Sequence, residues 1–165
     1  NKPIKPHDLQ RTLVHVCQEG LVKTVVEETA VLEPIQPTNE IRILLAEDNK
    51  INQKVAMRML ERLGYKAEVA KNGLEVLVAQ RQNPFDIILM DVQMPEMDGL
   101  EATQQIRENA ALYEHPYIIA LTANALKGDR ERFLSAGMDG YLSKPVRLED
   151  LAAALGQCQT EPLPT

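Results

Sequence analysis

The sequence predicts an α/β fold in which a parallel β-sheet carries helices on both faces. The first observation is that short apolar runs alternate five times with helical patterns between residues 41 and 156. Parallel neighbouring strands need crossover connections, and a helix between successive strands supplies them. The second observation is an unbroken apolar run, Ile87 to Met90, between Asp86 and Asp91, which is typical of a strand buried on both faces.

The elements follow one another regularly along this stretch. Strands are expected at residues 41–46, 65–70, 87–90, 117–121 and 140–142. Helices are expected at residues 51–63, 126–136 and 148–155, and two more begin after Asn72 and Asp98, each with a Glu three residues later, as in a capping box. The first helix carries an apolar stripe, as in a helix that packs one side on a core. Its members recur every four positions: Ile51, Val55, Met59 and Leu63.

Composition sets limits on the class of protein. A chain of 165 residues holds one ordinary domain with about 40 residues to spare. The hydrophobic content of 44% and charged content of 25% are those of a soluble globular protein, without an apolar run of membrane-spanning length or a signal-peptide pattern. We therefore expect a cytoplasmic chain without membrane contact. The net charge of −6 argues against a nucleic-acid partner, and Cys17 and Cys158 are expected to be reduced, buried thiols.

The first 40 residues differ from the rest. Residues 2–13 align without gaps on residues 144–155 with five identities, including a Lys-Pro pair before a helical pattern. We interpret residues 1–20 as the C-terminal remnant of a preceding domain of the same kind, although two amphipathic helices can also match by chance. Residues 21–40 are expected to be a linker and residues 157–165 a tail. The chain begins at Asn1 without Met, and we expect it to be a piece of a longer protein.

The chain's chemistry gathers at one edge of the expected sheet, where five polar side chains follow strands: Glu47, Asp48, Asp91, Thr122 and Lys144. Three carboxylates repel one another unless a positive group lies among them, and Mg²⁺ is a hard cation that takes oxygen ligands and phosphate oxygens. A cation, a lysine and a hydroxyl around one carboxylate are the groups that phosphoryl transfer needs, with Asp91 as the nucleophile. The simpler alternative is that Asp91 only caps the loop after its strand.

At these positions the chain resembles the receiver domain of two-component signalling, the phosphoacceptor module of response regulators and hybrid histidine kinases. The resemblance covers residues 41–156. It rests on five motifs in order: Glu47-Asp48-Asn49, Asp91 with Met94-Pro95, Asp98-Gly99, Thr122-Ala123 and Lys144-Pro145. The resemblance implies a flavodoxin-like, doubly wound sheet of five parallel strands in the order 2-1-3-4-5, preceded here by an N-terminal helical extension.

The resemblance also implies a metal site. Asp91 would be the phosphorylated aspartate and a Mg²⁺ ligand, and Asp48 would bind the ion directly. Glu47 would act largely through water, and the backbone carbonyl of Gln93 would be a further ligand. Many relatives have Asp where this chain has Glu47, which leaves the affinity for the ion open.

Further roles concern the phosphoryl group and the response to it. By resemblance, Lys144 would pair with the phosphoryl oxygens and Thr122 would bond one of them. Tyr141 matches the aromatic switch of the family, whose ring turns inward when Thr122 is drawn to the phosphate; otherwise it is an ordinary edge-strand aromatic. The peptide bond between Lys144 and Pro145 is expected to be cis.

Residues 48–55 look most like receivers that are fused to histidine kinases. The expected function is therefore transfer of a phosphoryl group from a phosphohistidine, on a histidine kinase or a histidine phosphotransfer domain, to Asp91. This makes the chain a phosphoacceptor rather than a turnover enzyme, within a parent chain that is a hybrid histidine kinase. Two alternatives stay open: an interaction module independent of phosphorylation, and an Asp-nucleophile phosphotransferase. The apolar stripe within residues 8–19 needs a partner surface, either on this chain or in a homodimer.

Overall fold

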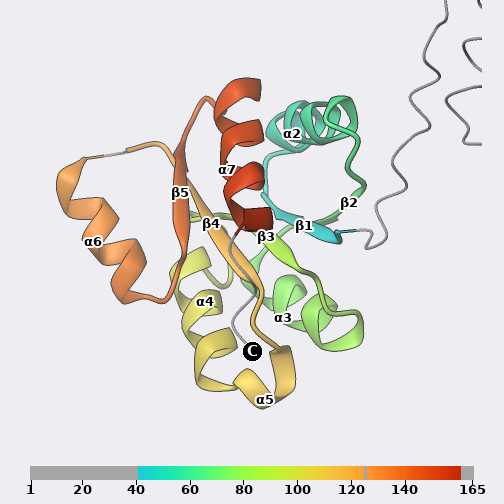
Figure 1. The fold of residues 1–165 in the computed structure, drawn as a ribbon. Helices are drawn as coiled ribbons and strands as arrows, with labels where there is room; N and C mark the ends of the chain where they lie inside the picture. The colour runs from blue at the N-terminus through green and yellow to red at the C-terminus, as the bar shows by residue number, and fades with distance from the viewer. Residues whose placement is uncertain (1–40, 125, 161–165) are drawn as a thin grey trace, which may run out of the picture. The chain divides into compact units, whose positions relative to one another are not determined.

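The computed structural model describes residues 41–124 and 126–160, which contain one five-stranded sheet (Figure 1). Its strands are β1 (Ile43–Ala46), β2 (Ala67–Ala70), β3 (Ile87–Asp91), β4 (Tyr117–Thr122) and β5 (Gly140–Ser143). All four strand pairs are parallel and the order is β2-β1-β3-β4-β5, which confirms the expected flavodoxin-like topology. The helix, linker and repeat expected within residues 1–40 lie outside the described residues, as do the last five residues of the expected tail.

The helices between the strands are α2 (Lys50–Arg62), α3 (Gly73–Gln82), α4 (Gly99–Glu108), α5 (Ala110–Tyr113) and α6 (Lys127–Ser135), and α7 (Leu148–Thr160) follows the last strand. The caps expected for α3 and α4 are confirmed, because the side chain of Asn72 accepts from the Glu75 N–H and that of Asp98 accepts from the Glu101 N–H. The short helix α5 was not expected from the sequence. Among the described residues, no helix combines the length and the apolar character that a membrane span requires.

The sheet separates two hydrophobic layers. On one face α2 and α7 pack against the strands, and Leu60, Leu151 and Leu155 are almost wholly buried there. On the other face α3, α4 and α6 pack against the alternate side chains of the same strands, with Ile106 and Phe133 in the core. Figure 1 shows α2 beside α7 on one side of the sheet and α3 with α4 on the other. Because strands β1, β3 and β4 are covered on both faces, their apolar runs are continuous.

The expected apolar stripe of α2 packs on the core only in its second half, where Met59 and Leu63 are partly buried. Ile51 and Val55 are 72% and 48% exposed, and the residues that α2 buries are Ala56 and Leu60. Positions four apart on a helix of 3.6 residues per turn drift by about 40° at each step, so a stripe of that spacing leaves the buried face. The helix therefore presents its first two large apolar side chains to solvent.

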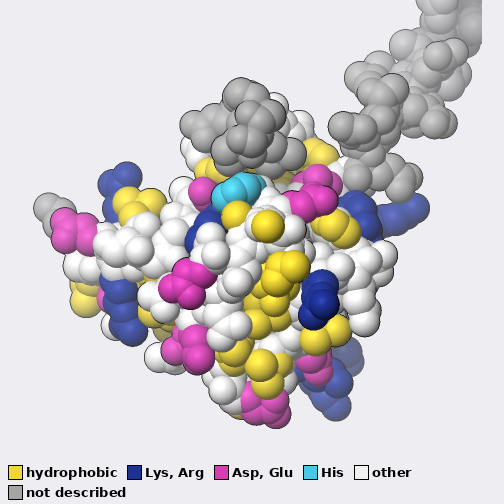
Figure 2. Space-filling model, turned by 90° about the horizontal axis from the view of Figure 1, so that it is seen from below, with side chains coloured by type: hydrophobic (Ala, Val, Ile, Leu, Met, Phe, Trp, Pro, Cys, Tyr) yellow, Lys and Arg dark blue, Asp and Glu magenta, His cyan; other side chains and the backbone are white. Residues whose placement is uncertain are grey.

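One expectation about burial agrees with the structure. Cys158 is 8% exposed, as expected for a buried thiol, whereas Cys17 lies outside the described residues. Figure 2 shows the face that is below in Figure 1, where hydrophobic side chains form a stripe between acidic and basic ones. The Lys and Arg side chains of the described residues on this face lie apart from one another, with Asp and Glu among them.

Candidate functional site

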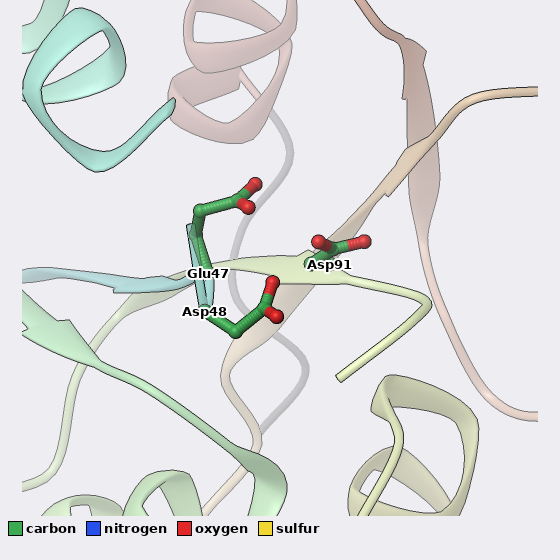
Figure 3. A group of neighbouring side chains, drawn as sticks. All are labelled: Glu47, Asp48 and Asp91. Carbon is green, nitrogen blue, oxygen red and sulfur yellow. The ribbon is translucent and has the colours of Figure 1, made fainter. Parts of the chain in front are cut away.

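Three carboxylates meet at the carboxyl edge of the sheet. Glu47 and Asp48 directly follow β1 and Asp91 ends β3, and these two strands are hydrogen-bonded neighbours. One carboxylate oxygen from each residue lies within 4.8 Å of the others, and Figure 3 shows the three side chains around one space. Glu47 is 1% and Asp91 5% exposed, whereas Asp48 is exposed. An all-oxygen set of this kind suits a hard cation such as Mg²⁺.

Lys144 supplies positive charge to this cluster. It follows β5, and its Nζ donates to Glu47 Oε2 at 2.7 Å and to Asp91 Oδ2 at 2.6 Å. Burial alone lowers the pKa of the Lys144 ammonium, but the hydrogen bonds to Asp91 and Glu47 outweigh it and leave that pKa above its usual value. Two buried carboxylates thus share one ammonium, and Asp48 adds a third negative charge. The site keeps an excess of negative charge that a divalent cation can neutralise.

The surroundings of Asp91 disfavour the ionised form of its carboxyl group. Burial raises the pKa of Asp91 above its usual range, and the nearby charge of Glu47 acts in the same direction. The hydrogen bonds from Lys144 and from the Gln93 N–H, the latter 3.1 Å from Oδ1, offset this rise only in part. A cation or a positively charged partner at this edge therefore stabilises the ionised, nucleophilic form of Asp91.

The first turn of α2 holds Glu47, a role that sequence reasoning missed. Glu47 Oε1 accepts from the Asn49 N–H at 3.2 Å and from Asn52 Nδ2 at 3.1 Å. Gln53 Nε2 also donates to the Glu47 backbone carbonyl at 2.6 Å. Because Glu47 accepts on both oxygens, its side chain is fixed in one orientation. The spacing in the sequence could have predicted that Asn52 lies near Glu47, since a side chain five residues after Glu47 falls in the first turn of the following helix.

The loop after Asp91 approaches the strand closely at Gly99. A Cβ on Gly99 would lie 2.2 Å from the Asp91 backbone oxygen and 2.8 Å from Met90 Cγ, so only glycine fits there. The Gly99 N–H also donates to the Val92 carbonyl at 3.2 Å. Gln93, whose carbonyl is expected to bind metal, lines the same cleft as Asp91.

Thr122 lies in this cleft and Tyr141 does not line it. Thr122 ends β4 and is 7% exposed, and its Oγ1 donates to the Asn124 carbonyl at 2.9 Å, closing the turn after the strand. Tyr141 lies on β5 opposite Ala120 and is 40% exposed, so its side chain is at the surface. The Lys144–Pro145 bond is cis, as expected. Among the expected site residues, Glu47, Asp48, Asp91, Gln93, Thr122 and Lys144 line the cleft together.

Comparison with known sequences agrees with this geometry. The family model described as the response regulator receiver domain matches residues 43–156. "Probable histidine kinase 1" from Oryza sativa subsp. indica is 41% identical over 150 residues, covering 73% of this chain and 16% of that protein. "Hybrid signal transduction histidine kinase G" from Dictyostelium discoideum is 43% identical over 119 residues, covering 71% of this chain and 4% of that protein. The chain thus spans a small part of these relatives.

Solved structures agree as well. The receiver domain of the sensor histidine kinase PA1611 from Pseudomonas aeruginosa, with a magnesium ion in its active site cleft, has a TM-score of 0.68 and 41% identity, covering 74% of this chain and 100% of that one. The Ssk1 receiver domain of Saccharomyces cerevisiae, crystallised with the histidine phosphotransfer protein Ypd1, has a TM-score of 0.67 and 31% identity, covering 72% and 88%. This chain therefore belongs to the response regulator receiver domains of two-component signalling, and most resembles those of hybrid histidine kinases.

Proposed function

We propose that Asp91 accepts a phosphoryl group from a phosphohistidine in a reaction that requires Mg²⁺. The observation that carries this proposal is the buried carboxylate of Asp91, 2.6 Å from the Lys144 ammonium and beside Glu47 and Asp48. A nucleophile with a cation site and an ammonium at hand is the arrangement that phosphoryl transfer uses.

The transfer exchanges one bond to phosphorus for another. A carboxylate oxygen of Asp91 forms a bond to phosphorus as the phosphorus–nitrogen bond of the phosphohistidine breaks, and the imidazole keeps the bonding electron pair. Lys144 neutralises negative charge on the phosphoryl oxygens. The Thr122 hydroxyl gives up its hydrogen bond to the Asn124 carbonyl and donates a hydrogen bond to one of these oxygens instead. Bound Mg²⁺ supplies further positive charge to these oxygens. Asp48, Asp91 and the Gln93 carbonyl would hold the ion, with Glu47 acting through water.

The exposed ring of Tyr141 is the proposed readout of this reaction. When Thr122 turns toward the phosphoryl group, it leaves space beside β4 and β5 into which the Tyr141 ring can move. Such a change shifts an existing equilibrium between two arrangements of this face. The surface position of the ring in the described structure is the arrangement expected before phosphorylation.

The proposed donor is a histidine kinase or a histidine phosphotransfer domain that docks on α2. Ile51 and Val55 lie one turn apart, are both largely exposed, and stand on the helix whose first turn borders the cleft through Asn49 and Asn52. Exposed apolar side chains next to a reactive site are typical of a surface that binds a partner. The likeness to a receiver crystallised with a phosphotransfer protein supports this choice of donor. The likeness to hybrid kinases supports a parent chain of that kind.

Transfer from a phosphorylated histidine phosphotransfer domain tests this proposal. Ile51→Glu with Val55→Glu is expected to slow the transfer at least about tenfold, the equivalent of about 1.4 kcal/mol at the interface. Leu74→Glu with Val78→Glu, an equally spaced and exposed pair on α3, is the matched control and leaves the rate unchanged. Phosphorylation by a small phosphodonor should be the same for both variants. Equal transfer rates for the two pairs would contradict docking on α2.

A further inference from the structure

The loop between β3 and α4, residues 92–98, is held by the turn that precedes α3. The Gly73 N–H donates to the Met97 carbonyl at 3.0 Å, and Asn72 Nδ2 donates to Glu96 Oε2 at 3.0 Å. A Cβ on Gly73 would lie 2.6 Å from Met97 Cγ, so the loop rests directly on the first residue of α3. Two segments that are distant in the sequence are thereby joined next to the site.

Glu96 has an unfavourable backbone conformation that needs such support. Its φ of 68° lies in the left-handed region, which residues with a side chain seldom occupy. The loop containing it also contains Gln93 and begins directly after Asp91. A contact that fixes Glu96 therefore restrains the path of the backbone at Gln93, which lines the cleft.

The side-chain amide of Asn72 makes two hydrogen bonds, one through its oxygen and one through its nitrogen. Its Oδ1 accepts from the Glu75 N–H at 2.8 Å and so caps α3, while its Nδ2 donates to Glu96. Asn72 is 8% exposed, so water competes weakly for this amide. The side chain thus links the start of a rigid helix to the loop beside the phosphoacceptor.

We propose that Asn72 and Glu96 are positioning residues for the Mg²⁺ site, because their hydrogen bond holds the loop that carries Gln93. This inference rests on the proposed function, in which the Gln93 carbonyl is a ligand of the ion. Residues that orient metal ligands from outside the ligand set commonly affect metal affinity strongly.

Calorimetric titration of the full chain with Mg²⁺ tests the proposal through three variants. Asn72→Asp keeps the cap, since Asp caps helices as well as Asn, but places a carboxylate oxygen against Glu96. Added negative charge alone would tighten Mg²⁺ binding, whereas loss of the hydrogen bond is expected to weaken it by about tenfold. Glu96→Gln retains an acceptor for the Asn72 amide, and its affinity should stay within about threefold of the starting chain, because only a distant charge is lost.

The double variant Asn72→Asp/Glu96→Gln exchanges donor and acceptor and has the net charge of the starting chain. Its hydrogen bond can form again, so Mg²⁺ affinity should return to within about threefold of the original value. Unfolding by urea in EDTA reports stability separately, and a purely structural role would change that measurement while leaving Mg²⁺ affinity unaltered. Asn72→Asp binding at least as tightly as the original chain, or a double variant as weak as Asn72→Asp, overturns the positioning role. If the original chain binds no Mg²⁺, the proposed function itself fails.

Discussion

Single side chains decide the electrostatics of the site. The Lys144 ammonium contacts the Glu47 and Asp91 carboxylates at once. The sequence predicted that these residues lie together, since parallel strands bring their carboxyl ends to one edge. It could not predict the contact from Asn52, because that contact depends on a side-chain rotamer and on the angle at which α2 leaves β1. The sequence also did not reveal that the Thr122 hydroxyl donates a hydrogen bond within the turn that follows β4.

Asn52→Asp tests whether Asn52 holds Glu47. The change replaces a donor to a buried carboxylate by a second carboxylate, and we expect the free energy of unfolding at neutral pH to fall by about 2 kcal/mol. An acidic residue in the first turn of a helix is otherwise favourable, so local helix preference predicts the opposite sign. Urea unfolding in EDTA measures the difference.

Gln104→Glu is the control for that substitution, because it makes the same amide-to-acid change at an exposed position of α4. Its free energy of unfolding should stay within about 0.5 kcal/mol of the original chain. If Asn52→Asp is as stable as this control, the hydrogen bond from Asn52 to Glu47 does not contribute to the free energy of unfolding.

The elements follow from the sequence with errors at their ends, the largest at α7, which was expected to end at residue 155 and continues to Thr160, into the expected tail. Apolar runs located all five strands, yet β1 and β2 begin two residues later than expected, at Ile43 and Ala67. Arg42 shows one reason, since its N–H donates to the Asp86 side chain at 2.8 Å as β1 begins. A different error concerned the buried face of α2. Burial depends on how a helix lies across the sheet, and a spacing of four residues alone cannot define it.

Two glycine substitutions compare the crowded first residue of α4 with an open position inside α7. Gly99→Ala places a methyl group against the Asp91 backbone, and we expect the free energy of unfolding to fall by about 1 to 3 kcal/mol. Gly156→Ala in α7 meets no atom within 4 Å and should stabilise the chain by about 0.5 to 1 kcal/mol through helix preference. Thermal unfolding of both variants measures these effects. Gly99→Ala with unchanged stability would contradict the close approach of α4 to β3.

The arrangement of the whole sheet brings the reactive groups together. Asp91 on β3 lies next to β1 and β4 in the order 2-1-3-4-5, so acidic groups approach it from one side and Thr122 from the other. Lys144 directly follows the edge strand β5 and completes the cleft. The sequence motifs predicted this convergence because they occur at successive strand ends. They could not define the surface position of Tyr141, which depends on the packing of the edge strand.

The central claim is tested most directly by the intact mass of the chain after incubation with phosphoramidate and Mg²⁺. We predict a single phosphoryl adduct on the original chain, no adduct when EDTA replaces Mg²⁺, and none on Asp91→Asn. The absence of an adduct on the original chain, or an adduct of equal yield on Asp91→Asn, would contradict the assignment of Asp91 as the phosphoacceptor.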